Sequence, residues 1–271
     1  MATCLIEGHR IAYQRSGRGP PALLVHGITT NGFLWREVAP RLARRFDVVV
    51  VDLLGCGESD KPAAVSLSLK DHARRLAALV QALGLGPVHF VGHDLGGGIG
   101  QIAAVRWPGL LRTLTLVNCV AYDYWPVQPI LSLRTPVIRQ LLMGALDAGA
   151  LRLVVRRGLF HKERTAALME EFSRPLRTPE GRRALVQFAR SLDSTNLMEL
   201  ADELRTLRLP VTVFWGTADA YLSAAIPTRL AAEIPGCQVR RIDTAGHFVP
   251  LDEPELLAAG IEEVLSGGRA A

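Results

Sequence analysis

One short segment carries an acidic side chain in a setting that suits nucleophilic chemistry. Asp94 follows the apolar run 88–91 and stands two residues after Gly92 and two residues before Gly96. A strand, a tight turn and a helix make a nucleophile elbow, and the strained turn leaves room only for small residues at these two positions. Because both positions are glycine, the segment predicts an elbow with Asp94 as the nucleophile.

Two other interpretations of this segment are open. Asp94 would also suit the N-cap of a helix that begins after a glycine-rich turn. A phosphate-binding turn is the second interpretation, but the segment lacks the GxGxxG pattern, and no lysine follows as a P-loop requires. The positions of the other reactive residues favour the elbow.

Partners for a carboxylate nucleophile follow two later apolar runs. Such a nucleophile needs a base that activates water, and the base needs an acid that holds its tautomer. His247 follows the run 238–242, and Asp219 follows the run 211–214. Both side chains would lie on loops at the carboxyl edge of a sheet. The chain order of nucleophile, acid and histidine is the order that this kind of elbow requires.

Two backbone N–H groups are expected to stabilise negative charge next to Asp94. An oxyanion hole uses preorganised donors of this kind. Leu95 supplies one because it directly follows Asp94, and Ile28 supplies the other from the loop after the apolar run 22–25. We interpret His26, which precedes this loop, as a structural residue rather than a second base.

Strands and helices alternate at both ends of the chain. Apolar runs predict strands at 22–25, 48–51, 88–91, 114–117, 211–214 and 238–242. Amphipathic patterns predict helices at 33–45, 69–83, 96–107, 224–233 and 253–265. Continuous apolar runs between amphipathic helices are typical of a parallel sheet that is covered on both faces. We therefore predict an α/β fold with a mostly parallel, twisted sheet.

The alternation stops in the middle of the chain. Residues 122–208 contain helical patterns punctuated by prolines and no strand-like run. We predict a core domain made of residues 1–121 and 209–271, with residues 122–208 as a helical insertion.

Composition excludes several classes of protein. A chain of 271 residues that is 49% hydrophobic can bury a full core, which excludes a disordered chain. The net charge of +5 comes from arginines scattered among acidic residues, whereas nucleic-acid binding requires basic residues clustered with aromatic ones. We therefore expect no nucleic-acid partner.

The cysteines and the apolar runs bear on cofactors and location. The four cysteines lie far apart without a CxxC pair, so we expect free thiols, no metal site and no cofactor. The chain begins without a signal-peptide pattern, and no apolar run approaches the length of a bilayer span. A cytoplasmic protein without a membrane partner is expected, as a monomer or a homodimer.

The chain resembles the α/β-hydrolase superfamily over nearly its whole length. The matching stretches are His26-Gly27, residues 52–59, the elbow, residues 216–219 and residues 245–247. The pair His93-Asp94 is similar to the branch that contains epoxide hydrolases and haloalkane dehalogenases. This resemblance implies that the helical insertion forms a cap over the site. It also makes Asp123 an alternative acid, since some relatives place the acid in that part of the chain.

Two departures separate the chain from the members of that branch. Haloalkane dehalogenases typically hold the leaving halide with a tryptophan after the nucleophile, where this chain has Leu95, and often with an asparagine where it has Ile28. Epoxide hydrolases usually protonate the epoxide oxygen from cap tyrosines. The candidate donors and substrate contacts in this chain are Tyr122, Tyr124, Trp125 and Tyr221.

An aspartate nucleophile suits attack on a saturated carbon. Asp94 would displace a leaving group and form an alkyl ester, and His247, oriented by Asp219, would activate water against that ester. We expect a small hydrophobic organic substrate and favour epoxide opening, because tyrosines suit a departing oxygen. The alternatives are a haloalkane dehalogenase, an ester, lactone or carbon–carbon hydrolase, and a binding protein without catalysis, since fold alone does not fix function.

Overall fold

The structure is a computed structural model that describes residues 1–128, 130–145 and 149–267. Within these residues, eight strands form one sheet in the order β1-β2-β4-β3-β5-β6-β7-β8. The strands are β1 (Ala2–Ile6), β2 (His9–Ser16), β3 (Pro21–Val25), β4 (Asp47–Val51), β5 (Val88–Asp94), β6 (Leu111–Cys119), β7 (Val211–Gly216) and β8 (Gln238–Ile242). From β4 to β8 every neighbouring pair is parallel, and β2 pairs antiparallel with β1 and β4. The predicted mostly parallel sheet is confirmed.

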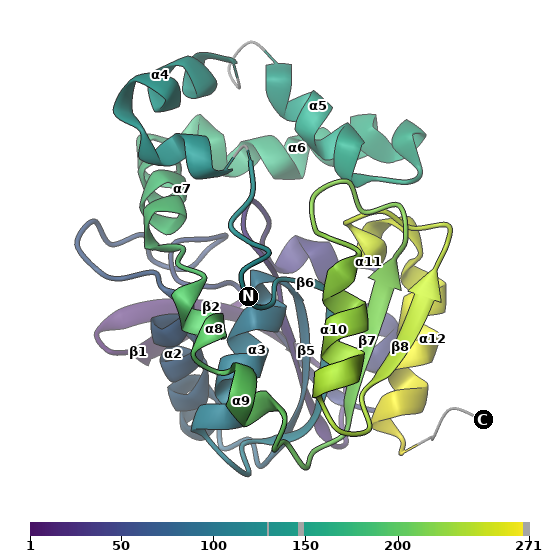
Figure 1. The fold of residues 1–271 in the computed structure, drawn as a ribbon. Coiled ribbons are helices and arrows are strands. Elements are labelled where there is room, and N and C mark those ends of the chain that lie inside the picture. Colours follow the sequence, from purple (N-terminus) through teal and green to yellow (C-terminus); the bar gives the residue numbers. More distant parts are fainter. Residues whose placement is uncertain (129, 146–148, 268–271) are drawn as a thin grey trace.

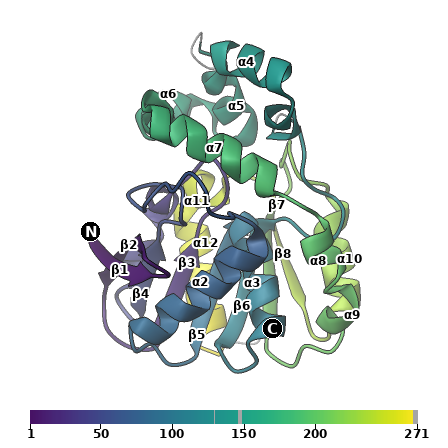
Figure 2. The same ribbon diagram turned by 90° about the vertical axis from the view of Figure 1, so that its left-hand side faces the viewer.

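Helices cover both faces of this sheet (Figures 1 and 2). One face packs against α2 (Leu69–Ala82), α3 (Leu95–Arg106) and α10 (Ala225–Glu233), and the other against α1 (Ala39–Leu42), α11 (Val249–Asp252) and α12 (Pro254–Leu265). A hydrophobic core lies on each face of the sheet, and β3 contributes to both, because successive side chains of a strand point to opposite faces. Leu23 and Val25 join the α2 and α3 core, whereas Ala22 and Leu24 join the α1 and α12 core.

One predicted helix is shorter than its pattern suggested. The segment 33–45 forms the 3-10 helix η1 (Gly32–Trp35) and the four-residue helix α1. Pro40 lies in the first turn of α1. Proline has no N–H to donate to a preceding turn and is tolerated only at the start of a helix. A continuous helix therefore cannot run through this position.

The chain between β6 and β7 is helical. The described elements are η2 (Ile130–Arg134), α4 (Pro136–Ala145), α5 (Leu151–Gly158), η4 (Lys162–Arg164), α6 (Thr165–Ser173), η5 (Arg174–Arg177), α7 (Pro179–Ser191), α8 (Thr195–Met198) and α9 (Ala201–Leu204). Helices α4 to α7 form a layer beyond the carboxyl ends of the parallel strands (Figure 1). Helices α8 and α9 instead run alongside α3 and contact it. Among the described residues, no helix has the length and apolar character needed to cross a membrane.

Candidate active site

Asp94 lies at a sharp turn between β5 and α3. Its backbone φ is +52°, which L residues rarely adopt, and its side chain makes no capping hydrogen bond to α3. A Cβ on Gly92 would lie 2.4 Å from the Gly96 carbonyl oxygen, and one on Gly96 would lie 2.4 Å from the Val25 carbonyl oxygen. The geometry is that of a strained elbow, and both glycines are needed because nothing larger fits.

The Asp94 carboxylate is buried among backbone donors. Its Oδ2 accepts a hydrogen bond from Ile28 N at 3.0 Å, and the nearby N–H of Leu95 also stabilises the charged carboxylate. Burial raises the pKa of Asp94, and the charge of His247 and these two N–H groups act in the opposite direction. The structure therefore brings both predicted backbone donors to the predicted nucleophile.

His247 and Asp219 form a hydrogen-bonded pair beside Asp94. The distance from His247 Nδ1 to Asp219 Oδ2 is 2.9 Å. Burial acts to lower the pKa of His247, but the charge and hydrogen bond of Asp219, together with the charge of Asp94, raise it above its usual value. Burial acts to raise the pKa of Asp219, but His247 and its other donors hold it at about 2. Asp219 is therefore ionised at neutral pH.

Asn118, near the end of β6, holds Asp219 in place, and this role was not predicted from the sequence. Its Nδ2 donates to Asp219 Oδ2 at 2.7 Å, and its Oδ1 accepts from Gly216 N at 2.7 Å. The backbone N–H groups of Tyr221 and Leu222 donate to the other oxygen of Asp219. Asp219 thus accepts four hydrogen bonds, which fixes its orientation towards His247. The only sequence signal for Asn118 was a polar residue at the end of an apolar run.

Two buried side chains, His93 and Asp252, hold the backbone of the loop that carries His247. His93 Nε2 donates to the carbonyl oxygen of His247 at 2.9 Å, and burial lowers the pKa of His93 to about 3, so its ring is neutral. Asp252 accepts a hydrogen bond from Gly246 N at 2.9 Å. It also accepts from Phe160 N and His161 N, which belong to the helical insertion. Asp252 therefore joins the insertion to the histidine loop.

His26 has the structural role expected of it. Its Nδ1 donates to the Gly27 carbonyl oxygen at 2.7 Å, and its Nε2 accepts from Leu53 N at 3.0 Å. Both ring nitrogens are occupied by backbone groups, so His26 shapes the loop that presents Ile28.

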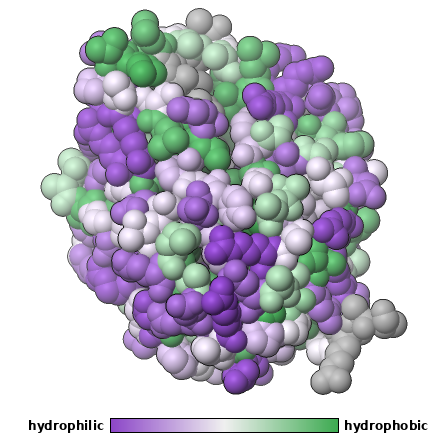
Figure 3. Space-filling model, in the orientation of Figure 1, coloured by the Kyte–Doolittle hydropathy of each residue, from purple (hydrophilic) through white to green (hydrophobic). Residues whose placement is uncertain are grey.

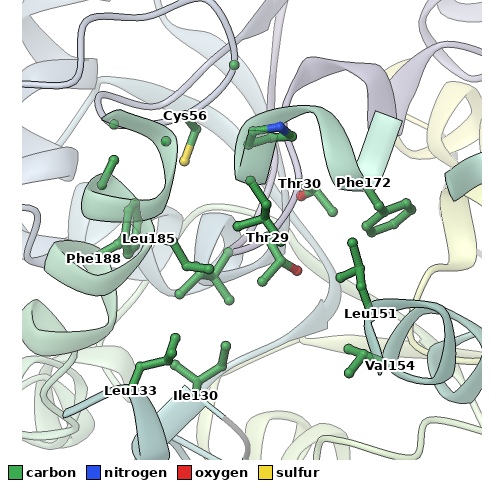
Figure 4. A pocket seen from close by; sticks show the side chains of 17 residues that line it. Thr29, Thr30, Cys56, Ile130, Leu133, Leu151, Val154, Phe172, Leu185 and Phe188 are labelled. Carbon is green, nitrogen blue, oxygen red and sulfur yellow. The ribbon is translucent and has the colours of Figure 1, made fainter. Parts of the chain in front are cut away.

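A cavity opens above the Asp94 and His247 side chains. The chamber next to them, which we call the triad chamber after Asp94, His247 and Asp219, is also lined by Gln128 and Tyr221 and holds about 480 Å³ of space, including its opening to solvent. It shares lining residues, among them Ile28 and Ile130, with a second, apolar chamber that holds about 780 Å³ of space on the same measure. Side chains that point into the apolar chamber include Cys56, Leu133, Leu151, Phe172, Leu185 and Phe188 (Figure 4). Together the two chambers suit an apolar molecule that reaches Asp94 at one end.

The four predicted donor residues lie in two places. Tyr221 lines the triad chamber, and its hydroxyl donates to the Val154 carbonyl oxygen. Tyr122 lies under the Arg229 guanidinium of α10, 3.8 Å from its ring centroid, and Tyr124 packs edge-on against Tyr122. Trp125 is buried in the hydrophobic core that also contains side chains of α2 and α3. None of the latter three is among the described lining residues of either chamber, which favours a packing role for them.

The alternative acid lies apart from the histidine. The Asp123 side chain is 63% exposed and faces Arg229 at 3.8 Å. Asp219 is therefore the carboxylate that the structure pairs with His247. Among the residues that the structure describes, no group of three or more histidine, cysteine, aspartate or glutamate side chains could hold a metal ion.

Comparison with known proteins identifies the family. The sequence profile of the alpha/beta hydrolase fold matches residues 20–254, so the chain belongs to this family of hydrolytic enzymes. It is 29% identical to haloalkane dehalogenase 2 of Mycobacterium tuberculosis over 269 residues, which cover 94% of this chain and 91% of that protein.

Solved structures of the family superpose along the whole chain. A putative ancestral haloalkane dehalogenase gives a TM-score of 0.85 at 25% identity and covers all of both chains. The epoxide hydrolase CorEH also gives a TM-score of 0.85, at 23% identity, with 99% of each chain covered. The second likeness bears on the fold alone. Structural neighbours thus include both dehalogenases and epoxide hydrolases.

Proposed function

We propose that this protein hydrolyses an apolar substrate at a saturated carbon through a covalent ester of Asp94, and that an epoxide is its substrate class. The observation that carries the proposal is the placement of a carboxylate at the elbow, with Oδ2 on Ile28 N at 3.0 Å. In most enzymes that cleave acyl esters, a serine stands at such an elbow. A carboxylate in its place would form a mixed anhydride with an acyl group, which is a poor route. A carboxylate attacks a saturated carbon readily.

The first step forms the ester. Oδ2 accepts the hydrogen bond from Ile28 N, so Oδ1 of Asp94 attacks the carbon in line with the bond that breaks. The C–O bond of the epoxide breaks, its electron pair goes to the oxygen, and that oxygen takes a proton. Tyr221 is the tyrosine on the described lining of the triad chamber, and burial raises its pKa to about 12, so it carries its proton at neutral pH. We assign it as the donor, with its hydrogen bond to Val154 exchanged for one to the epoxide oxygen.

The second step releases the diol. His247 removes a proton from a water molecule, whose oxygen attacks the carboxyl carbon of the Asp94 ester. The tetrahedral anion is stabilised by the N–H groups of Ile28 and Leu95. Collapse of this anion breaks the ester bond, and the departing alkoxide takes the proton from His247 to complete the diol. The carboxyl proton left on Asp94 passes to the Tyr221 phenolate, which returns the carboxylate, the neutral histidine and the tyrosine. The pair with Asp219 stabilises the imidazolium that His247 becomes during this step.

The helical insertion acts as a cap in this proposal. Residues 122–208 supply Val154, Phe172, Phe188 and other apolar side chains to the chamber walls. A wall of this kind excludes water from the reacting carbon and selects for apolar substrates.

Haloalkane dehalogenation is the second candidate, because a relative at 29% identity is a haloalkane dehalogenase. A departing halide needs N–H donors near Asp94. Leu95 and Ile28 stand where such donors are common in dehalogenases, and the indole of Trp125 lies outside the described cavity lining. The cavity therefore suits a departing oxygen better than a halide.

A product screen tests the proposal. The purified protein is incubated with small apolar epoxides, with 1-haloalkanes and with p-nitrophenyl esters, and diol, halide and phenolate are measured. We expect diol from the epoxides and no diol from Asp94→Asn. Asp123→Asn is the matched control, because it makes the same change at an exposed aspartate and should keep full activity. Turnover of haloalkanes alone would favour the second candidate. Equal turnover by Asp94→Asn would show that Asp94 is not the nucleophile.

A further inference from the structure

The outer surface of the helical insertion exposes large apolar side chains. On α4, Val137 is 68% exposed, Ile138 46% and Leu141 71%, and Leu153 of α5 is 68% exposed. Figure 3 shows hydrophobic side chains gathered over α4, with hydrophilic ones directly below them. Single exposed apolar residues are common, but a helix that presents three of them on one stripe indicates an interaction surface.

An arginine-lined groove runs next to this apolar stripe, between α4 and α7. Its walls carry the groove arginines Arg139 from α4 and Arg183 and Arg190 from α7. Arg182 of α7 also lines the groove, but its Nε donates to the Leu176 carbonyl oxygen, and it is not counted among the groove arginines. Its described lining residues include no aspartate or glutamate. Arg183 also donates to the carbonyl oxygen of Lys61, which holds the groove against the core. The groove is therefore a concentration of positive charge beside an exposed apolar helix.

We propose that this face, formed by α4 and the arginine groove, docks on an anionic lipid bilayer. An interfacial helix inserts apolar side chains below the headgroups, while basic side chains pair with anionic lipids. Exposed Val137 and Leu141 match the first requirement, and the groove arginines match the second. A helix that lies in the surface of the bilayer needs no spanning segment. The expectation of no membrane partner was drawn from the lack of a spanning run, so it does not apply to this kind of surface binding.

Other occupants fit the surface less well. In a symmetric dimer the same face would meet itself, and two copies of the groove arginines would repel each other. Single-stranded nucleic acid would need aromatic side chains on which bases stack, and the described groove lining has none. A free anion would occupy the groove without covering the apolar stripe of α4. A bilayer with anionic headgroups covers both parts at once.

The docked orientation brings the bilayer next to the substrate cavity. Helix α7 presents Arg183 and Arg190 to the groove and, from its opposite side, Leu185 and Phe188 to the apolar chamber. Apolar molecules concentrate in the bilayer, so the cavity would draw its substrate from the membrane rather than from water. This consequence rests on the proposed function, whereas the docking itself does not.

Vesicle sedimentation tests the docking. The full chain is mixed with phosphatidylcholine vesicles with and without phosphatidylserine, and the bound fraction is measured at low and high salt. We expect binding to the anionic vesicles that falls with salt. Val137→Glu with Leu141→Glu should abolish it. Arg139→Glu with Arg190→Glu should weaken it by at least tenfold, since each arginine near an anionic surface contributes about fivefold.

Matched variants separate this face from the rest of the surface. Leu256, 51% exposed on α12, is the control for the apolar substitutions. Arg18→Glu with Arg44→Glu reverses two exposed charges that precede β3 and β4, at the end of the sheet opposite the insertion. Leu256→Glu, the Arg18 and Arg44 variant, and Asp94→Asn should all bind vesicles as the unmodified protein does. The Asp94 variant keeps a failure of the docking distinct from a failure of the catalytic proposal.

Three results of the vesicle assay would overturn the docking proposal. The first is no binding to anionic vesicles, and the second is equal binding to neutral ones. The third is a loss of binding in the control variants as large as in the α4 variants. Light scattering on the same samples adds a fourth: a dimer that the α4 substitutions convert to a monomer, without vesicle binding, would assign the face to a second copy of the chain.

Discussion

Removal of the Asp252 carboxylate should destabilise the protein more than any other single change to an acidic residue outside the catalytic group. Asp252 is 1% exposed and accepts hydrogen bonds from Gly246 N and Phe160 N at 2.9 Å and from His161 N at 3.0 Å. Asp252→Ala leaves these three N–H groups without an acceptor. Asp252→Asn keeps one carboxamide oxygen, so its effect should be smaller.

The magnitude follows from the number of stranded donors. A buried donor left unsatisfied costs about 1–3 kcal/mol. The Gly246 N–H is buried, and the Phe160 and His161 N–H groups are partly buried. Together they lower the free energy of unfolding by about 3 kcal/mol, which is a large part of the about 5–15 kcal/mol that stabilises a typical domain. Catalysis should fall as well, because Gly246 directly precedes His247.

Urea denaturation followed by circular dichroism measures the loss. Glu253→Gln is the matched control, because Glu253 is the adjacent acid and bonds the partly exposed His161 side chain instead of buried backbone. Its unfolding free energy should stay within about 0.5 kcal/mol of the unmodified protein. A loss below about 1 kcal/mol in Asp252→Ala would refute the reasoning, since it would mean that solvent satisfies the three N–H groups.

Three further predictions address the site. Gly27→Ala should lower kcat about a hundredfold or more, because the new Cβ would lie 2.2 Å from Asp94 Oδ2 and displace the carboxylate from its backbone donors. Steady-state kinetics measure the change in kcat, and an unchanged kcat would contradict the geometry. Tyr122→Phe should leave kcat and KM unchanged, because its hydroxyl faces α10; a large drop in kcat would restore Tyr122 as the proton donor. The rate of ester hydrolysis should fall as the pH drops through the raised pKa of His247, because protonated His247 cannot act as a base. Asp219→Asn removes the charge that raises this pKa, so stopped-flow pH profiles should show the acid limb move to lower pH, and an unmoved limb would show that another group titrates.

The sequence was sufficient for the sheet and for the residues at its carboxyl edge. Apolar runs predict buried strands directly, and the glycines around Asp94 report a turn with no space for a side chain. Asp219 and His247 could be proposed from the sequence because each lies in the loop that follows a strand. These features depend on local sequence, so one chain is enough to find them.

The supporting residues escaped prediction because they act over long separations. Asn118 bonds a residue 101 positions away, and His93 bonds one 154 positions away. No local pattern marks such a partner. Tyr122 was predicted to contact substrate, but its backbone has a φ of +55°, and the turn directs its ring towards Arg229. The pattern of α4 likewise indicates an apolar stripe without showing whether that stripe is covered.

Isotope incorporation during a single turnover tests the central claim most directly. Excess enzyme is mixed with an epoxide substrate in ¹⁸O-labelled water, quenched, digested and analysed by mass spectrometry. The covalent route predicts label in the carboxylate of Asp94 and an unlabelled oxygen in the first molecule of diol, because water attacks the ester carbonyl and the original aspartate oxygen leaves with the product. Label in the diol with none in Asp94 would contradict it, because water would then have attacked the substrate directly.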